Sequence, residues 1–401
     1  MADFGVTELE TFRAEARAWL EENCPKSLRR TDELDWETAM IPVKPSGDAK
    51  LWKERIVAKG WGTPTWPKEY GGGGLSQSEA RVLQQEMARI GADNPIQGMG
   101  PGMFGHTLLE YGTEAQKLRH LIPISRGEQR WCQGYSEPGA GSDLASLQTK
   151  CEDKGDHWEV NGQKIWTSGA QYADWCFCLV RTDPKAKKHE GISFVLINMH
   201  QPGVETRPIR LIAGSSPFCE TFFTAARVEK DDMVGPLNGG WTVGKRLLQH
   251  ERSGQGSMRG AASVSISDIA KKYVGVDEQG RLADSDLRSR LAAHMINAKA
   301  HTLTLQRAVA EARGNLNPSA TTSVMKNSGT WVQQERAELT LEIMGTQGLG
   351  WDGDDFTPDE RTAVRSWLSG KATTIFGGSQ EIQSNIVSKR ILGLPDTTQS
   401  S

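Results

Sequence analysis

The sequence contains no apolar run long enough to cross a bilayer, which argues against a transmembrane helix. Its N-terminus also lacks the basic-then-apolar pattern of a secretory signal. An excess of charge of either sign is missing as well, because 47 Lys and Arg residues face 50 Asp and Glu residues and the net charge is only −3. Such a balance creates no global field for nucleic acid or an anionic membrane, so we expect a cytoplasmic protein that binds neither.

Cysteine is scarce too, and the spacing of the six cysteines does not suit a metal site. No C-x-x-C pair occurs, and Cys176 and Cys178 are expected to share one strand face as reduced core residues. We therefore predict no bound metal. The cysteines are Cys24, Cys132, Cys151, Cys176, Cys178 and Cys219.

The chain is long enough, at 401 residues, for two or three domains with a sizeable core. Apolar residues recur at helical spacing in its first part, which predicts an N-terminal α-helical domain over residues 1–127. Thr7 and Glu10 predict a capping box at the start of the first helix. Further helices are predicted over residues 51–59, 76–90, 103–111 and 114–121.

The pattern then changes to β-branched and aromatic residues, which predicts a middle β domain over residues 128–234. Within it, Asn161-Gly162 is a strong hairpin signal and predicts a turn at that point. The residues on either side are therefore expected to belong to two different strands.

Helical spacing returns beyond a glycine-rich break and predicts a C-terminal α-helical domain over residues 235–401. Thr357 and Glu360 predict a capping box for one of its helices. Ser379 predicts the N-cap of the last helix. The chain is thus expected to run α, β, α.

Two short segments of the middle region stand out by their composition, and we call them together the cradle. Residues 131–143 (WCQGYSEPGAGSD) combine three glycines, a proline and several hydroxyls, so the backbone can approach a flat ligand while side chains bond its edge. Residues 164–168 (KIWTS) add the indole plane of Trp166. Taken singly, residues 139–141 are typical of a surface turn and Trp166 of a core aromatic residue. Together the two segments predict a binding site that we interpret as a flavin site.

The string SEPGAGSD, followed about two dozen residues later by NGQKIWTSGAQYADW, strongly resembles the acyl-CoA dehydrogenase family. These flavoenzymes desaturate acyl-CoA thioesters between Cα and Cβ, and the resemblance covers nearly the whole chain. It implies an α+β multidomain fold with an N-terminal α-helical domain, a middle β-barrel or sandwich domain and a C-terminal four-helix-bundle domain. The order α, β, α agrees with this architecture.

The resemblance implies FAD as the cofactor. In the family the first segment of the cradle wraps the flavin ring and the second stacks a Trp on it, so Ser136 is expected to donate to the pyrimidine edge and Trp166 to pack against the ring. Ser168 is expected to reach toward N5 and O4, where a donor stabilises the charge that arrives with a hydride. The predicted FAD-binding residues are Gln133, Tyr135, Ser136, Gly141, Ser142, Trp166, Thr167, Ser168, Gly345, Ser379 and Glu381.

Three of these residues come from later motifs. Gly345 belongs to residues 342–350 (EIMGTQGLG), which resemble the family's glycine-rich loop near the FAD phosphates. Ser379 and Glu381 belong to residues 376–383 (FGGSQEIQ), which resemble its C-terminal motif. Glu381 stands where Gln is common, so the chain departs from the family pattern at that position.

Desaturation of a thioester requires a carboxylate that removes the α proton. In many family members this Glu follows the aromatic residue of the C-terminal motif, but here Phe376 is followed by Gly377. Another branch takes its Glu from the helix after the β domain, directly before an Arg, and Glu251-Arg252 matches that pattern. The resemblance therefore implies Glu251 as the catalytic base. Residue statistics alone favour a solvated helix acid paired with a cation at this position.

The resemblance also implies where acyl-CoA binds. Gly377 lacks a carboxylate but keeps an N–H that can polarise the thioester carbonyl. Arg252 is expected to structure the acyl-CoA pocket. The predicted substrate-binding residues are Ser142, Gln249, Arg252 and Gly377.

We therefore predict an oxidoreductase of fatty acid or lipid catabolism, as in β-oxidation, that desaturates an acyl-CoA and passes electrons to an electron-transfer flavoprotein. The same fold also hosts flavin-dependent monooxygenases, which need no carboxylate base. The loss of Glu at Gly377 also suits a non-catalytic subunit of a heteromeric dehydrogenase. Glu251 favours the dehydrogenase over the monooxygenase.

An absent motif bears on assembly. Family homotetramers usually carry an Arg-x-x-Phe-Gly segment whose Arg reaches the FAD pyrophosphate across a subunit interface, and residues 278–290 contain no such segment. Chains with this combination resemble larger subunits of heteromeric dehydrogenases that act on pimeloyl-CoA or steroid side-chain CoA esters. A heterotetramer with a homologous acyl-CoA dehydrogenase chain is therefore predicted, with a homotetramer as the alternative.

Overall fold

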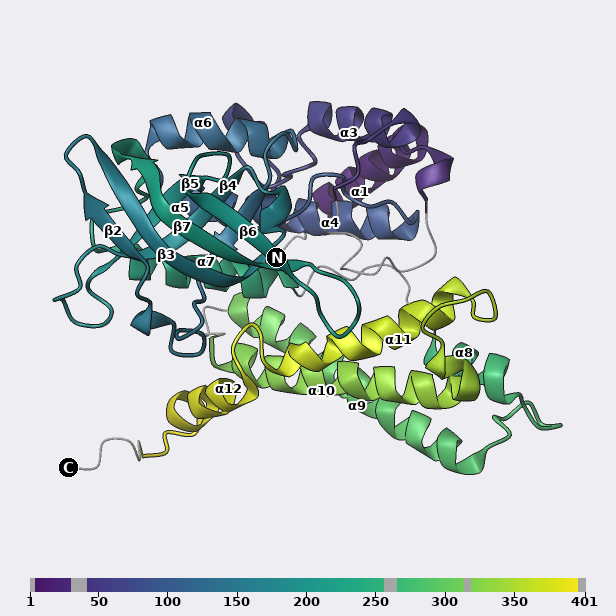
Figure 1. Ribbon diagram of the computed structural model, residues 1–401. Coiled ribbons are helices and arrows are strands. Elements are labelled where there is room, and N and C mark those ends of the chain that lie inside the picture. The colour runs from purple at the N-terminus through teal and green to yellow at the C-terminus, as the bar shows by residue number, and fades with distance from the viewer. Residues whose placement is uncertain (1–3, 30–41, 256–264, 314–318, 396–401) are drawn as a thin grey trace. The chain divides into compact units, whose positions relative to one another are not determined.

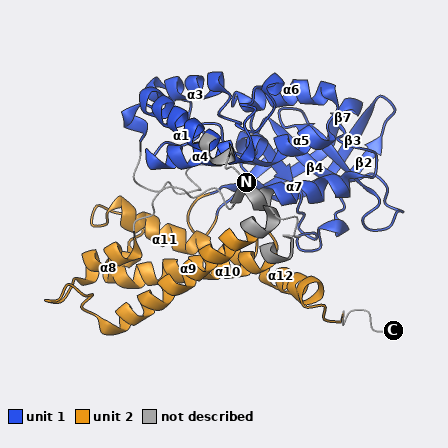
Figure 2. Ribbon diagram, turned by 180° about the vertical axis from the view of Figure 1, so that it is seen from behind, with its two compact units in different colours: residues 1–210, 216–263 blue, residues 211–215, 264–401 orange. Residues whose placement is uncertain are grey.

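The computed structural model describes residues 4–29, 42–255, 265–313 and 319–395. They form two compact units, one made of residues 1–210 and 216–263 and the other of residues 211–215 and 264–401 (Figure 2). Each unit has hydrophobic clusters of its own. No helix within the described ranges has the length and apolar character to span a bilayer.

The first unit begins with helices (Figure 1), and the apolar faces of the first three of them meet around Leu20, Trp52 and Leu83. Ser76 and Glu79 form a capping box that satisfies free N–H groups at the start of one of them, which explains where it begins. The helices are α1 (Phe4–Asn23), α3 (Gly47–Lys59), α4 (Gln77–Arg89), α5 (Gly105–Tyr111) and α6 (Glu114–Ser125).

Two details at the helix starts differ from the sequence predictions. Helix α1 begins at Phe4, so the capping box predicted at Thr7 is wrong, because position 7 already lies inside the helix. Helix α5 was expected from residue 103, but residues Gly100–Phe104 form a π-helix, η3, directly before it. Gly105 lets the backbone at this junction pack closely against the Trp66 ring, since a Cβ on residue 105 would lie 2.0 Å from that ring.

The strands of the first unit form one seven-stranded sheet, with the order β1-β4-β2-β3-β7-β6 and with β5 paired to β4. Strand β4 is buried along nearly its whole length, which fits its run of apolar residues. The strands are β1 (Trp131–Gly134), β2 (Lys150–Asp153), β3 (His157–Ser168), β4 (Trp175–Arg181), β5 (Ile192–Asn198), β6 (Val204–Ile209) and β7 (Phe218–Glu229).

The hairpin turn predicted at Asn161-Gly162 is wrong. Strand β3 runs through these residues and has a register shift against β7 between Val160 and Gly162. The turn lies earlier, where Lys154 N donates to His157 O and Gly155 has a φ of +92°. The side-chain oxygen of Asn161 instead accepts a hydrogen bond from Ala225 N, so the Asn-Gly pair lies in a β-bulge.

Helix α7 (Gly240–Gln255) follows the sheet and belongs to the first unit. It packs against β5, against α5 and against η3. Gly240 permits the close approach to β5, because a Cβ there would lie 2.3 Å from the Ser193 carbonyl carbon. Val243 and Leu247 are fully buried on the same helix face, which fixes α7 on the sheet.

The second unit is helical. The capping box predicted at Thr357 and Glu360 is confirmed, and so is Ser379 as the N-cap of α12. Helix α8 was not predicted, because the Gly- and Ser-rich stretch before it is typical of a loop. The helices are α8 (Ile266–Val274), α9 (Ser285–Arg313), α10 (Ser319–Met344), α11 (Pro358–Gly370) and α12 (Gln380–Ile386).

All six cysteines are buried and unpaired by disulfides. Burial raises the pKa of Cys151 to about 12, so its thiol stays protonated at neutral pH. Among the residues that the structure describes, no group of three or more His, Cys, Asp or Glu side chains has the arrangement of a metal site.

Candidate active site

The structure brings the two segments of the cradle together. Ile165 N donates to Ser136 O at 2.9 Å, which joins the start of the glycine-rich loop to the tryptophan segment. Lys164 Nζ reaches the same loop and donates to Tyr135 O at 3.0 Å. The pairing of SEPGAGSD with KIWTS in one site, predicted from the sequence, therefore has a direct backbone counterpart.

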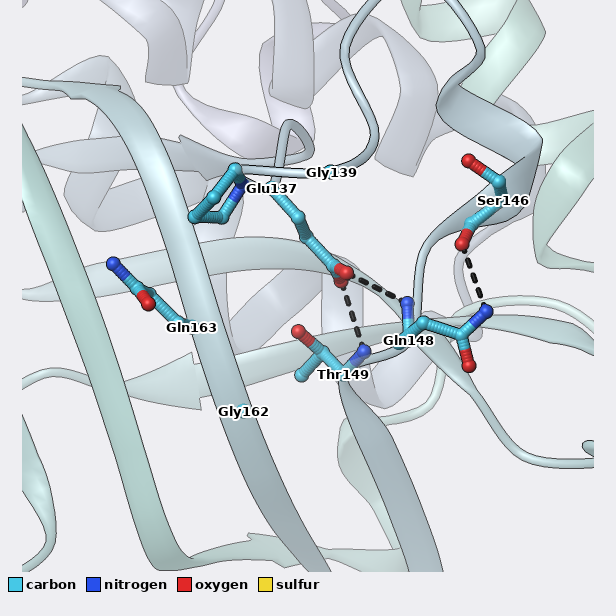
Figure 3. Close-up of a pocket in the computed structure, with 8 residues that line it drawn as sticks. Glu137, Gly139, Ser146, Gln148, Thr149, Gly162 and Gln163 are labelled. Atoms are coloured by element: carbon cyan, nitrogen blue, oxygen red, sulfur yellow. Dashed lines mark hydrogen bonds between the residues drawn. The ribbon is translucent and has the colours of Figure 1, made fainter.

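A buried ion pair lies under this junction. Lys164 Nζ is 2.8 Å from Glu137 Oε1, and the two side chains are 0% and 8% exposed. The Glu137 carboxylate also accepts hydrogen bonds from Gln148 N and Thr149 N, as Figure 3 shows. Burial raises the pKa of the Glu137 carboxyl, but the Lys164 ammonium together with the hydrogen bonds that Glu137 accepts holds this pKa below its usual range.

Sequence analysis assigned no role to Lys164 or Glu137. The only signal was that the short second segment contains a single charged residue and that the first contains a Glu next to Pro138. A buried lysine needs a partner of opposite charge. The Lys164–Glu137 pair could therefore be predicted only once the two segments were known to be in contact.

Trp166 is presented outward by an irregular backbone. Its φ is +60°, in the left-handed region that costs a side-chain-bearing residue about 1–3 kcal/mol. The β3–β7 pairing has a register shift between Lys164 and Thr167, at the same point. The indole is 52% exposed and meets Phe218 edge to face, with ring centroids 6.0 Å apart. A large ring on strained backbone is a feature of functional sites, and this ring is free to stack on a planar ligand.

In the cradle, the side-chain atoms Trp131 Nε1 and Gln133 Nε2 on β1 and Thr167 Oγ1 on β3 are buried without a hydrogen-bond partner in the described part of the chain. Buried donors without a partner cost about 1–3 kcal/mol each, so they point to a bound group that satisfies them. Ser168, next to Thr167, is half-buried and ends β3.

The other predicted residues of the cradle take different positions. The Tyr135 ring lies in the core, edge to face with Phe177 and Phe194, so its contact with a ligand stays a prediction. Gly141 and Ser142 are exposed, and a Cβ on Gly141 would meet no atom within 4 Å. This part of the loop therefore has room for a ligand.

Helix α7 passes close to the core side of the cradle. A Cβ on Gly244 would lie 3.3 Å from the Tyr135 hydroxyl oxygen, and the buried Leu247 is one turn further along. Position 251 follows Leu247 by another four residues, so the backbone places it on the same helix face. The side chains of Glu251 and Arg252 lie outside the described part of the structure, and their roles stay predictions. Gln249 accepts a hydrogen bond from Arg246 Nη1 at 3.0 Å.

The remaining predicted residues belong to the second unit. Gly345 and Gly377 have φ values of +56° and +68°, which only glycine adopts without strain. Ser379 Oγ accepts a hydrogen bond from Ile382 N and so acts as a cap. The Glu381 carboxyl has a pKa below its usual range, through hydrogen bonds with its own backbone and with Ser379. A role for these four residues in FAD or substrate binding stays a prediction.

A pocket of about 300 Å³ lies beside the glycine-rich loop (Figure 3). None of the predicted FAD-binding or substrate-binding residues lines it. The Glu137 carboxylate at its wall is engaged by Lys164 and by two backbone N–H groups. The lining residues are Glu137, Pro138, Gly139, Ser146, Gln148, Thr149, Gly162 and Gln163.

Fold and cradle together define a class of enzyme, and comparison with known proteins identifies it: the chain belongs to the acyl-CoA dehydrogenase family. Family models for the N-terminal, middle and C-terminal domains of acyl-CoA dehydrogenase match residues 7–128, 132–226 and 238–392. The chain is therefore an oxidoreductase of a family whose members generally bind FAD.

Individual relatives agree with this assignment. The chain is 34% identical over 400 residues to acyl-CoA dehydrogenase IpdE1 of Mycobacterium tuberculosis, a match that covers 97% of this chain and 99% of that one. Among solved structures, the Tcur3481-Tcur3483 steroid ACAD is 29% identical with a TM-score of 0.77, over 98% of both chains. The ChsE4-ChsE5 complex from Mycobacterium tuberculosis is also 29% identical, with a TM-score of 0.73, over 97% of this chain and 98% of that chain.

The buried ion pair generates a prediction about stability. Lys164→Met removes the ammonium but leaves the Glu137 carboxylate buried, so we expect the free energy of unfolding to fall by about 3–5 kcal/mol at pH 7. Because the folded-state pKa of Glu137 is lowered, the contribution of the pair is present above the ordinary carboxyl pKa and is lost as the pH falls through the lowered value. Urea unfolding at pH 7 and at lower pH measures both effects.

The matched control is Lys150→Met, at an exposed lysine of β2, where we expect a change within about 0.5 kcal/mol. The double variant Lys164→Met with Glu137→Gln is expected to recover part of the loss, since no charge remains buried. Equal unfolding free energies for the variants at positions 164 and 150 contradict the account.

Proposed function

We propose that the protein is an FAD-dependent acyl-CoA dehydrogenase that introduces a Cα–Cβ double bond into an acyl-CoA thioester. The observation that carries this proposal is the arrangement in the cradle, where the exposed Trp166 ring lies on the same short segment as the unsatisfied Thr167 hydroxyl. An exposed planar ring beside buried donors suits a flat, polar-edged ring system.

The residues of the cradle fit FAD. Trp166 would stack on the flavin ring, while Ser136, Thr167 and Ser168 would bond its polar edge, and Gln133 Nε2 supplies a further donor. The exposed Gly141 and Ser142 would line the site where the loop has room. In the second unit, Gly345, Ser379 and Glu381 would hold the remainder of the cofactor. When bound, FAD supplies the acceptor for the hydride that leaves Cβ.

Glu251 is proposed as the base that removes the α proton. Its support is the helical register of α7, which continues the face of Gly244 and Leu247 that packs beside Tyr135. A carboxylate in a site closed to water is a stronger base than in solution, because burial disfavours its charged form. The Gly377 N–H would polarise the thioester carbonyl, and Ser142, Gln249 and Arg252 would hold the acyl-CoA.

The proposed base gives a direct prediction. Glu251→Gln keeps the size of the side chain and removes its charge, so we expect flavin reduction by acyl-CoA to slow by at least about 10²–10⁴-fold, the usual contribution of a general base. FAD content and folding should not change. Stopped-flow measurement of flavin bleaching tests this, and bleaching at a rate near that of the unchanged protein would sink the assignment.

The two flavin contacts at the end of β3 are predicted to act differently. Trp166→Ala should weaken FAD binding in both redox states, because stacking does not depend on the charge of the ring. Ser168→Ala should mainly slow hydride transfer, since a hydrogen bond near N5 and O4 strengthens as the flavin gains charge. FAD dissociation, flavin reduction potential and reduction rate are the measurements. An unchanged potential together with an unchanged rate in Ser168→Ala would refute its role.

Electrons are proposed to pass to an electron-transfer flavoprotein, and the oligomer is proposed to include a homologous chain. Support for a homologous partner comes from the similar ChsE4-ChsE5 structure, which is a complex of two different chains. Within the region that lacks Arg-x-x-Phe-Gly, Arg281 Nε donates to Asp277 at 2.9 Å and Arg288 Nη1 donates to Leu282 O at 3.0 Å. Both arginines have partners within their own chain, which supports supply of the missing Arg by another subunit.

Expression of the chain alone and with a homologous acyl-CoA dehydrogenase chain tests the assembly. We expect a flavin-poor protein in the first case and a flavin-replete heterotetramer in the second. Stoichiometric FAD and full turnover in a homotetramer would end the partner proposal. CoA thioesters of short, long, dicarboxylic and steroid-derived acids form the substrate panel, the last because one matching structure is a steroid ACAD.

A further inference from the structure

Helices α5 and α7 of the first unit pack against each other (Figure 1). A cluster of charged and aromatic side chains joins them. Arg246 Nε donates to Glu110 Oε2 at 2.7 Å, and Arg246 Nη2 donates to Oε1 at 2.8 Å. His250 Nε2 lies 3.0 Å from the same Oε1 atom. One carboxylate of α5 thus binds two side chains of α7, and those two lie one helical turn apart.

Aromatic contacts extend the cluster. The ring of His250 stacks on that of His106, with centroids 5.4 Å apart and an interplanar angle of 27°. His106 in turn meets Trp66 edge to face at 6.0 Å. Trp66 is 1% exposed and belongs to the hydrophobic core of the unit, so the His106 end of the cluster packs against the core.

At neutral pH only Glu110 and Arg246 carry charge within this cluster. Hydrogen bonds from Arg246 hold the pKa of the Glu110 carboxyl below its usual range. Burial, aided by Arg246, lowers the pKa of His250, and burial together with His250 lowers the pKa of His106 to about 4. Because the carboxylate has no proton, the proton of the contact lies on His250 Nε2, which donates it to Glu110.

The geometry of the cluster controls rotation of α7 about its own axis. A helix with its side chains has a radius of about 5–6 Å, so a rotation of about 10° moves a side-chain tip by about 1 Å. Positions 246 and 250 face one carboxylate, and a rotation in either direction breaks the bidentate contact or the histidine contact. Positions 249, 251 and 252, the predicted substrate and base positions, lie on the same two turns.

We propose that Glu110 is a positioning residue for the proton-removing step, because its contacts with Arg246 and His250 fix the rotation of the α7 segment that carries Glu251. This inference rests on the proposed function. The role of the cluster is geometric more than stabilising, since the Glu110 and Arg246 side chains are 36% and 41% exposed. Ion pairs of such exposure contribute only about 0–1 kcal/mol to folding.

The first test uses Glu110→Gln, which keeps the shape of the side chain. Its amide has only one oxygen, so it cannot accept both hydrogen bonds that Arg246 donates to the carboxylate. A displacement of about 1 Å costs up to about 100-fold in rate, so we expect flavin reduction at saturating acyl-CoA to slow by about 10–100-fold. The dissociation constant of acyl-CoA, the FAD content and the unfolding midpoint should stay close to those of the unchanged protein. Glu114→Gln is the matched control, because Glu114 lies on a different helix, α6, and likewise accepts a side-chain hydrogen bond, from the Tyr70 hydroxyl at 2.8 Å.

A second pair of variants separates the hydrogen bond from the volume of the side chain. His250→Gln keeps an N–H that can reach Glu110, whereas His250→Met has a similar size and no donor. We expect His250→Gln to reduce flavin within about threefold of the unchanged rate and His250→Met to be slowed at least about 10-fold. Equal slowing of the two variants overturns the inference, and so does a rate for Glu110→Gln within twofold of the unchanged protein.

Hydrogen exchange of peptides from α7 adds a measurement that needs no catalysis. Faster exchange over residues 246–255 in Glu110→Gln, but not in Glu114→Gln, is expected, and identical exchange overturns the inference. A rate loss that follows a lowered unfolding midpoint also overturns it. Failure of the proposed function is a separate result, because the unchanged protein would then not bleach with any acyl-CoA. The exchange comparison would still decide whether the Glu110 contacts order α7.

Discussion

The buried ion pair of Lys164 with Glu137 is the interaction on which the arrangement of the cradle depends. One segment lies in a loop and the other in strand β3, and the ion pair joins them with both side chains buried. A buried ammonium without its carboxylate would cost several kcal/mol, so the two segments must stay together for the unit to remain folded. The backbone bond between Ile165 and Ser136 then sets their spacing, and the strained backbone at Trp166 turns its indole outward.

Helix α7 is held against this arrangement by two different kinds of contact. Its first half is fixed by close packing at Gly240 and by the buried Val243 and Leu247. Arg246 and His250, on either side of Leu247 in the sequence, add polar contacts with α5. Packing fixes the distance of the helix from the sheet, whereas the polar contacts fix its rotation, and the proposed base lies at the end where rotation matters most.

Sequence reasoning reached the parts of this account that depend on local motifs. Residues 131–143 and 164–168 were paired correctly because a family pattern links them, and the caps at Thr357 and Ser379 were found because capping is a local interaction. The turn at Asn161-Gly162 was wrong because a bulge and a hairpin use the same residues, and only pairing with β7 distinguishes them. Glu110 was missed because its partners lie 136 and 140 residues away, and no local pattern encodes such a contact.

The central claim is that the cradle holds FAD and that the bound acyl-CoA is oxidised there. Anaerobic addition of the CoA-thioester panel to the flavin-loaded protein, with absorbance of the flavin as the readout, tests it most directly. The account predicts that at least one thioester bleaches the oxidised flavin, without oxygen or reduced nicotinamide, and yields the α,β-unsaturated thioester. Flavin that stays oxidised with every thioester, and that is reduced only by another donor before reacting with oxygen, would contradict it.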